Sequence, residues 1–242
     1  MKINIQIMKK IVLTLLFAAI AAVTYSQEGQ EGWYLGVQAS PVLSWMTSSN
    51  QNTTTGNGSN LGIKLGILGE YHFGERYAIT AGAGAVLNHG GTLSHMGMDS
   101  TVNVFSEVPV NVNESGIPTT PVDIKYNMQM FEASFGLRMK TDPILLDDLY
   151  FYGEAPFLIH IRTQARGTWD GMGRENITGN TRFFNLAWGI GGGAQYDLGS
   201  KAIITAGLFI HQGISHTVRV DEDNIKLGIN ALTLKLGVLF KP

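Results

Sequence analysis

The chain has 242 residues, no cysteine, 30 glycines, 15% charged residues and a formal net charge of −2 at pH 7. The absence of cysteine excludes disulfides and cysteine-based metal sites. The charged fraction lies below the value of about a quarter that is usual in soluble proteins. No basic patch of the kind that nucleic-acid binding requires is present, so we expect no nucleic-acid partner.

The first residues predict an export signal. They have a basic start and an apolar run over residues 11–23, which is too short for a transmembrane helix and disfavours an anchor. Small residues follow at the positions that a signal peptidase reads, which predicts cleavage before Gln27. We therefore expect residues 1–26 to be a cleaved signal peptide and residues 27–242 to form one mildly acidic mature domain.

Residues 61–73 show the pattern that recurs along the mature chain. Every second residue from Leu61 is apolar or glycine, whereas the residues between are mostly glycine or charged. Only a β-strand sends successive side chains to opposite faces in this way. At roughly 3.3 Å per residue the stretch reaches about 40 Å, which suits a tilted strand that crosses a bilayer and projects beyond it.

The same alternation predicts a strand in eight segments. They are residues 33–44, 61–73, 77–88, 124–139, 149–163, 183–196, 201–216 and 226–240. The connections alternate between long and short, as in bacterial membrane barrels with long outer loops and short periplasmic turns. No further apolar run is long enough for a membrane helix. The expected fold is all-β: an eight-stranded antiparallel up-and-down transmembrane β-barrel in the outer membrane, with long outer loops, short periplasmic turns and periplasmic termini.

Two connections and one strand show further features. Residues 47–60 are rich in Ser, Thr, Asn, Gln and Gly, which predicts a solvated loop. Residues 89–121 contain three prolines and alternating valines, which fits a hairpin above the barrel rim or, less well, a plug folded inward. The apolar alternation changes phase between Met130 and Phe131, which indicates a β-bulge in that strand.

The alternating faces differ in composition, and this difference indicates which face lies outside. A soluble lipocalin-like barrel would also have eight alternating strands. However, glycines mixed with charges fit a narrow interior better than a wet surface. Because charges in a dry interior must pair, we expect a polar network that fills the lumen instead of an open pore. The expected interior polar network is Lys64, Glu70, Glu132, Arg138, Glu154, Arg162 and Lys235.

Aromatic residues on the apolar faces lie close to the predicted short turns or the chain ends. This placement puts them at one height, as in an interfacial aromatic girdle. The expected interfacial aromatics are Trp33, Tyr71, Phe73, Tyr77, Tyr196 and Phe240.

Three other motifs have ordinary explanations. The glycine run at residues 189–194 lies inside a predicted strand, whereas a dinucleotide site needs a strand-to-helix turn. The acidic residues 221–223 lack the fuller ligand set of a calcium loop. His89, His95 and His216 have serines nearby in sequence, but catalysis needs the two side chains to converge within about 3 Å. We expect solvated loop histidines, and no catalytic, cofactor or metal site.

Three segments resemble a known family. The end of the signal at Ser26 and Gln27, the strand at residues 131–138 and the strand at residues 150–156 together resemble the PorT-like outer-membrane β-barrel domain family. The closing strand, residues 234–240, is similar to the C-terminal strand that the barrel-assembly machinery reads. The resemblance implies an integral outer-membrane barrel, with outer-membrane lipid and the assembly machinery as partners. It implies no substrate.

These observations favour a non-enzymatic protein that acts as a structural or interaction scaffold with surface-exposed loops. One alternative is an outer-membrane lipid-modifying enzyme that uses His and Ser side chains at the rim. Another is a soluble exported, lipocalin-like barrel that binds a ligand.

Overall fold

The computed structural model describes residues 32–49, 51, 54–73, 76–95, 122–144, 148–169, 174–199, 201–218 and 226–241. The predicted signal peptide, the acidic segment 221–223 and residues 96–121 of the long connection lie outside these ranges. The predicted hairpin or plug in that connection therefore stays a prediction.

The described chain is almost entirely β-strand. Its elements are β1 (Gly32–Ser48), β2 (Thr54–His72), β3 (Tyr77–His95), β4 (Val122–Lys140), β5 (Leu149–Trp169), β6 (Glu175–Asn176), the 3₁₀ turn η1 (Thr178–Asn180), β7 (Phe184–Asp197), β8 (Ala202–Gly213) and β9 (Leu227–Phe240). Every pairing is antiparallel. Among the described residues, no helix has the length and apolar character needed to cross a bilayer.

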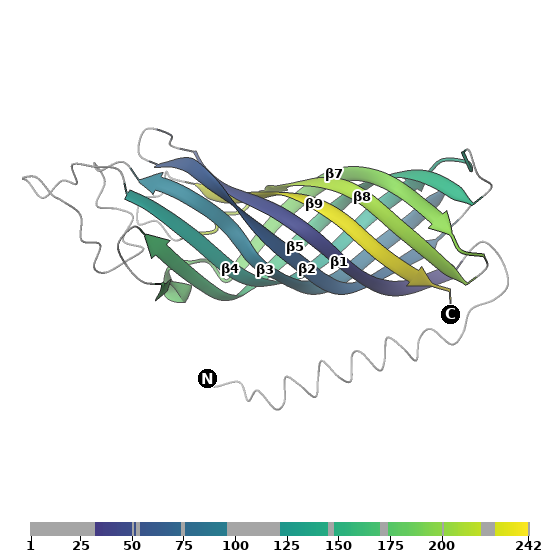
Figure 1. Ribbon diagram of the computed structural model, residues 1–242, viewed down its shortest axis with the longest axis horizontal. Coiled ribbons are helices and arrows are strands. Elements are labelled where there is room, and N and C mark those ends of the chain that lie inside the picture. Colours follow the sequence, from purple (N-terminus) through teal and green to yellow (C-terminus); the bar gives the residue numbers. More distant parts are fainter. Residues whose placement is uncertain are drawn as a thin grey trace, which may run out of the picture.

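The eight long strands close into a barrel. The sheet order runs from β4 through β3, β2, β1, β9, β8 and β7 to β5, and the β4–β5 pairing joins its two ends. The two-residue β6 adds only to the outer end of β5. Figure 1 shows the strands inclined to the long axis, with the end of β9 beside the start of β1. The predicted eight-stranded antiparallel barrel is confirmed.

The predicted loop at residues 47–60 is wrong for most of its length. β1 continues to Ser48 and β2 already begins at Thr54. This part of β2 pairs with β3, which itself continues to His95. Polar composition misled the prediction because these strand ends lie beyond the apolar outer wall, where outward side chains face water.

The predicted β-bulge in β4 is also misplaced. Even-numbered residues of β4 point inward along its whole length, so the strand itself does not change phase. The extra residues lie in its neighbours. From Val86 to His89, β3 advances by three residues while the paired β4 advances by only two. In β5, Thr163 lies between the partners of Gln129 and Met130 and has no pairing partner on β4. The apolar residues change face because the surroundings change. In the half of the barrel with the long connections, the outer part, the apolar side chains point into a dry core. In the half with the short turns and the chain ends, the inner part, they point out of the barrel to lipid.

The bulge in β3 has a local backbone cause. Asn88 has a φ of 60° and Gly90 a φ of 137°, the region that favours Asn and Gly. The Asn88 amide donates to the Leu61 carbonyl oxygen at 2.6 Å and its oxygen accepts from Asn127. These bonds join β2, β3 and β4 where the outer part of the barrel begins.

In the inner part of the barrel, which is the half with the short turns, apolar side chains point outward from the wall. Ile67 on β2, Phe135 on β4 and Leu234 on β9 are all exposed at the outer surface. In the outer part the arrangement reverses, and apolar side chains fill the centre. This outer core consists of Met46, Val86, Leu93, Ile124, Tyr126, Met128, Met130, Ala165, Ile177, Val218, Leu227 and Ile229.

Candidate functional site in the barrel lumen

The inner half of the lumen is built around Arg138. Its side chain is 0% exposed and lies directly across from Glu154, its pairing partner on β5. Arg138 Nε and Nη2 donate to Glu154 Oε2 at 3.0 and 2.6 Å, and Nη1 donates to Glu70 on β2. The guanidinium also stacks 4.0 Å from the centre of the Tyr152 ring. One cation on β4 therefore links a carboxylate on β2 with a carboxylate on β5.

Further polar groups complete this Arg138 cluster. Lys235 Nζ donates to both Glu154 oxygens at 3.1 and 3.2 Å, and Thr80 Oγ1 donates to Glu154 Oε1 at 2.9 Å. His72 Nε2 lies 3.2 Å from Glu70 Oε2, and Lys140 Nζ lies 3.0 Å from His72 Nδ1. Each buried carboxylate thus has more than one partner, the condition under which buried charges are tolerated.

A second cluster lies further along the lumen, around Glu132. Lys64 donates to Glu132 Oε1, and His160 Nε2 lies 3.0 Å from Glu132 Oε2. Gly84, which pairs with Glu132, lies so close to β2 that a Cβ atom there would be 2.5 Å from the Leu65 carbonyl oxygen. The His89 ring lies 5.6 Å from the His160 ring. This Glu132 cluster connects β2, β3, β4 and β5 from the inside.

Six of the seven charged residues expected in the interior lie in these two clusters. The seventh, Arg162, lies near the bulge of β5, where its Nε donates to the Arg182 carbonyl oxygen at 3.2 Å. The residues that extend the clusters without having been predicted there include His72, Thr80, Lys140 and His160. Each of them points to the same face of its strand as the neighbouring inward residues, so the alternation along the strand could have identified them.

The six aromatics expected at the interface lie near the short connections or the chain end. Trp33 on β1 contacts Tyr71 on β2 with ring centres 4.9 Å apart, and Phe73 stacks on Tyr77 at 6.2 Å. Tyr196 and Phe240 lie at the same end, on β7 and β9, and both are exposed on the outer wall.

The histidines expected in solvated loops lie in different surroundings. His89 is only 5% exposed and lies inside the barrel, because the β3 strand extends past the predicted end. His95 lies between Thr54 Oγ1 and the Tyr126 hydroxyl, each at 3.2 Å. The loop assignment is therefore wrong for both residues. His216 is half-buried near the end of the described segment that follows β8.

Among the described residues, no group of three or more His, Cys, Asp or Glu side chains is arranged to hold a metal ion. The dinucleotide-like glycine run lies within β7, and the next element along the described chain is the strand β8. Arg138 and Glu70 are both 0% exposed, so their contact cross-links strands inside the barrel and does not meet solvent.

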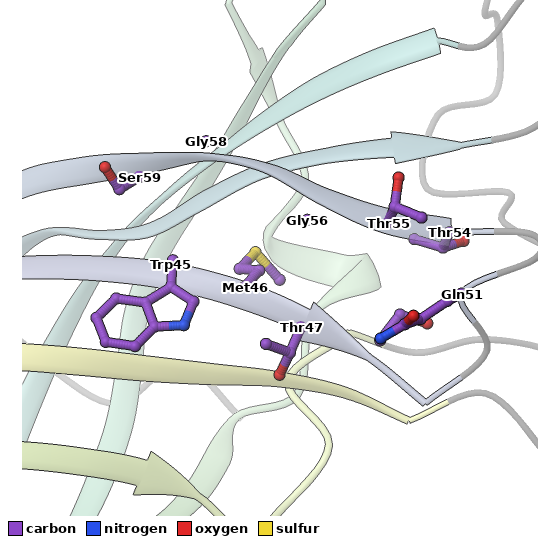
Figure 2. Close-up of a pocket in the computed structure, with 10 residues that line it drawn as sticks. Trp45, Met46, Thr47, Gln51, Thr54, Thr55, Gly56, Gly58 and Ser59 are labelled. Atoms are coloured by element: carbon purple, nitrogen blue, oxygen red, sulfur yellow. The ribbon is translucent and has the colours of Figure 1, made fainter.

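A separate cleft lies at the outer rim, between β1 and β2. Figure 2 shows part of its lining: Trp45, Met46 and Thr47 from β1, Gln51 from the connection, and Thr54, Thr55, Gly56, Gly58 and Ser59 from β2. Its volume is about 560 Å³, within the range of about 300–1,000 Å³ for small-molecule sites.

The comparisons with known proteins agree with this architecture. The chain belongs to the outer membrane protein β-barrel domain family, whose profile matches residues 11–240. It is an outer-membrane protein. No curated protein matches the chain in sequence.

Several solved structures are similar in fold. Neisserial surface protein A aligns with a TM-score of 0.50 and 15% identity, covering 89% of this chain and 100% of that one. The outer membrane protease OmpT from Escherichia coli aligns with a TM-score of 0.47 and 9% identity, covering 90% of this chain and 99% of that one. The attachment invasion locus protein of Yersinia pestis aligns with a TM-score of 0.38 and 12% identity, covering 87% of this chain and 100% of that one. At 15% identity, the similarity to Neisserial surface protein A shows the fold alone.

Proposed function

We propose that the protein is a non-enzymatic scaffold of the outer membrane, with a lumen filled by side chains and outer loops that meet a partner. Its proposed contacts are outer-membrane lipid, the barrel-assembly machinery during insertion, and an envelope or extracellular partner. The sequences of β4 and β5 support placing it with the PorT-like barrels. The aromatics at the inner end, from Trp33 to Phe240, support a belt at the periplasmic interface.

The filled lumen is the observation that carries this proposal. The outer core occupies the outer part, and the Arg138 and Glu132 clusters occupy the inner part. Between the Arg138 and Glu132 clusters, the cavity beside Lys64, Glu154 and His211 has a volume of only about 20 Å³. That space holds about one water molecule. A dissolved ion would have to displace both a dry core and paired charges to cross.

The alternative of a lipid-modifying enzyme has less support. Within the described residues, the hydroxyl–imidazole contacts near the rim join His95 to Thr54 and to Tyr126, and both of these hydroxyl-bearing residues are fully buried. A nucleophile must reach its substrate, which a buried threonine cannot do. The outer-membrane location leaves the soluble lipocalin-like alternative without support.

Planar-bilayer recording of the purified barrel tests the filled lumen. We expect no discrete conductance steps from the native chain. The double substitution Met128→Gly and Met130→Gly removes side chains from the outer core and serves as a comparison for leak through a weakened seal. Stable, uniform steps from the native protein would overturn the proposal and indicate a channel.

Lipid analysis tests the non-enzymatic assignment. Cells that produce the native chain and cells that produce the His95→Ala variant should have the same outer-membrane lipid profile. A modified lipid that depends on His95 would support the enzyme alternative instead.

A further inference from the structure

The rim cleft arises because the barrel wall splits between β1 and β2. Their pairing ends at Trp45 and Ser59. Beyond that point β1 stays paired with β9 as far as Ser48, and β2 stays paired with β3 as far as Thr54. At Met46 the two strands still lie close together, since a Cβ atom on Gly56 would be only 2.6 Å from the Met46 carbonyl oxygen. The strand edges therefore separate further out, toward Thr47 on β1 and Thr55 on β2, where backbone groups of an unpaired edge can bind a polar ligand.

The chemistry of the cleft is uncharged and rich in hydroxyl groups. Thr47, Thr55 and Ser59 contribute hydroxyls, Gln51 an amide and Trp45 an indole. None of the described residues that line the cleft is acidic or basic. Many hydroxyl partners beside an aromatic ring suit a neutral sugar, whose ring has apolar faces and a polar edge.

A second groove adjoins Trp45 on the outer wall. It has a volume of about 150 Å³ and lies between Trp45 and Trp188, with Ile190 and Ile210 among its lining residues. Trp188, Ile190 and Ile210 are all exposed on the lipid-facing side. Trp45 lines both the cleft and the groove, so the two sites meet at its side chain.

The groove crosses the outer limit of the apolar wall. Trp45 pairs with Asn230 on β9, Asn230 with Gln212 on β8, and Gln212 with Trp188 on β7. Two amides flanked by two tryptophans therefore form one row on the outside of the barrel. The next outward-pointing residue of β8 toward the inner end of the barrel is the apolar Ile210, two residues before Gln212. Tryptophans at such a boundary are typical of a membrane interface.

We propose that the cleft and the groove together bind one uncharged glycolipid of the outer leaflet. Its sugar lies in the cleft against Trp45, and one of its chains lies along the groove over Ile190 and Ile210. The polar part of the site lies above the apolar wall and the apolar part lies within it, as the two ends of a glycolipid require. A peptide strand fits less well, because β1 offers only residues 46–48 beyond its last pair with β2.

Native mass spectrometry tests this assignment. The full barrel is placed in phosphatidylcholine nanodiscs that contain a minor fraction of monogalactosyl diacylglycerol, and the lipids retained on the released protein are identified. We expect the galactolipid to be enriched over its bulk fraction. The Trp45→Ala variant should lower this enrichment by about threefold to tenfold, the effect of losing one aromatic contact.

Trp33→Ala is the matched control, because Trp33 is also an outward tryptophan of β1 but lies at the opposite end. It should keep the full enrichment. Ile210→Gln places a polar amide in the groove that takes the chain and should lower the enrichment while Trp45 is unchanged. Heat-modifiable gel migration checks that each variant is folded.

Three outcomes would overturn the assignment. The first is retention of galactolipid and phosphatidylcholine in their bulk ratio by the native barrel. The second is an equal loss for Trp33→Ala, which would indicate general aromatic anchoring. The third is full displacement of the galactolipid by methyl galactoside at equal concentration, which would leave the groove without a role.

Discussion

Met130 and Phe131 are neighbours in β4 and lie in two different media. Met130 is 2% exposed and packs in the outer core, whereas Phe131 is 43% exposed on the outer wall. Toward the outer end the apolar residues of β4 point inward, and toward the inner end they point outward. We infer that the outer surface of the membrane meets β4 at this pair.

This boundary can be measured by labelling, because the chain contains no cysteine of its own. Cysteine introduced at Gln129 should react with a membrane-impermeant maleimide added outside intact cells, since this outward position lies above the boundary. Cysteine at Ala133 should be protected, since it faces lipid. Labelling in denaturant provides the control for reactivity. Equal labelling at both positions in cells would show that the boundary lies elsewhere.

Arg138 should be essential for the stability of the inner lumen. Replacement by Met leaves Glu70 and Glu154 without their shared cation in a dry interior, which costs about 3–5 kcal/mol of unfolding free energy. Denaturant titration of the barrel in micelles measures the change.

Arg76 provides the matched comparison, because it also pairs with an acid but is exposed. Its contact with Asp142 is 2.6 Å long, and the two side chains are 56% and 67% exposed. Arg76→Ala should cost less than about 1 kcal/mol. A similar loss for both variants would contradict the structural role given to the Arg138 cluster.

Gly136 should tolerate no side chain. A Cβ atom there would lie 2.7 Å from Thr80 Oγ1 and 3.3 Å from Glu154 Oε1, so it would push apart the contact between these two groups. Gly136→Ala is expected to destabilise the barrel by about 1–3 kcal/mol. Gly153→Ala is the control, since its nearest neighbour is 4.0 Å away, and the difference is read from the same titration.

The outer core should respond to truncation like the interior of a soluble protein. Met128→Ala leaves a cavity in a closed core and is expected to cost about 2–5 kcal/mol. Leu65→Ala on the outer wall should cost less, because lipid chains can occupy the vacated space. Thermal unfolding in lipid vesicles compares the two variants. A larger loss for Leu65→Ala would contradict a packed outer core.

The sequence was most informative where the surroundings stay constant along a strand. In residues 61–73 the outward positions stay apolar or glycine throughout, so alternation predicts both the strand and its outward face. It was least informative in residues 47–60, where both strands leave the membrane and their outward side chains become polar. Pattern alone reads such a segment as a loop, because the pairing that keeps it extended comes from β9 and β3.

The sequence by itself determined the barrel class and the inward parity of each strand, because alternation is a local property of the chain. Only the tertiary structure decided which inward residues meet. Arg138 and Glu70 are separated by 68 residues, and their contact depends on how β2, β3 and β4 align in register. The split between β1 and β2 likewise depends on where pairing stops. Register and closure are set by the sum of pairings around the ring, which no single segment contains.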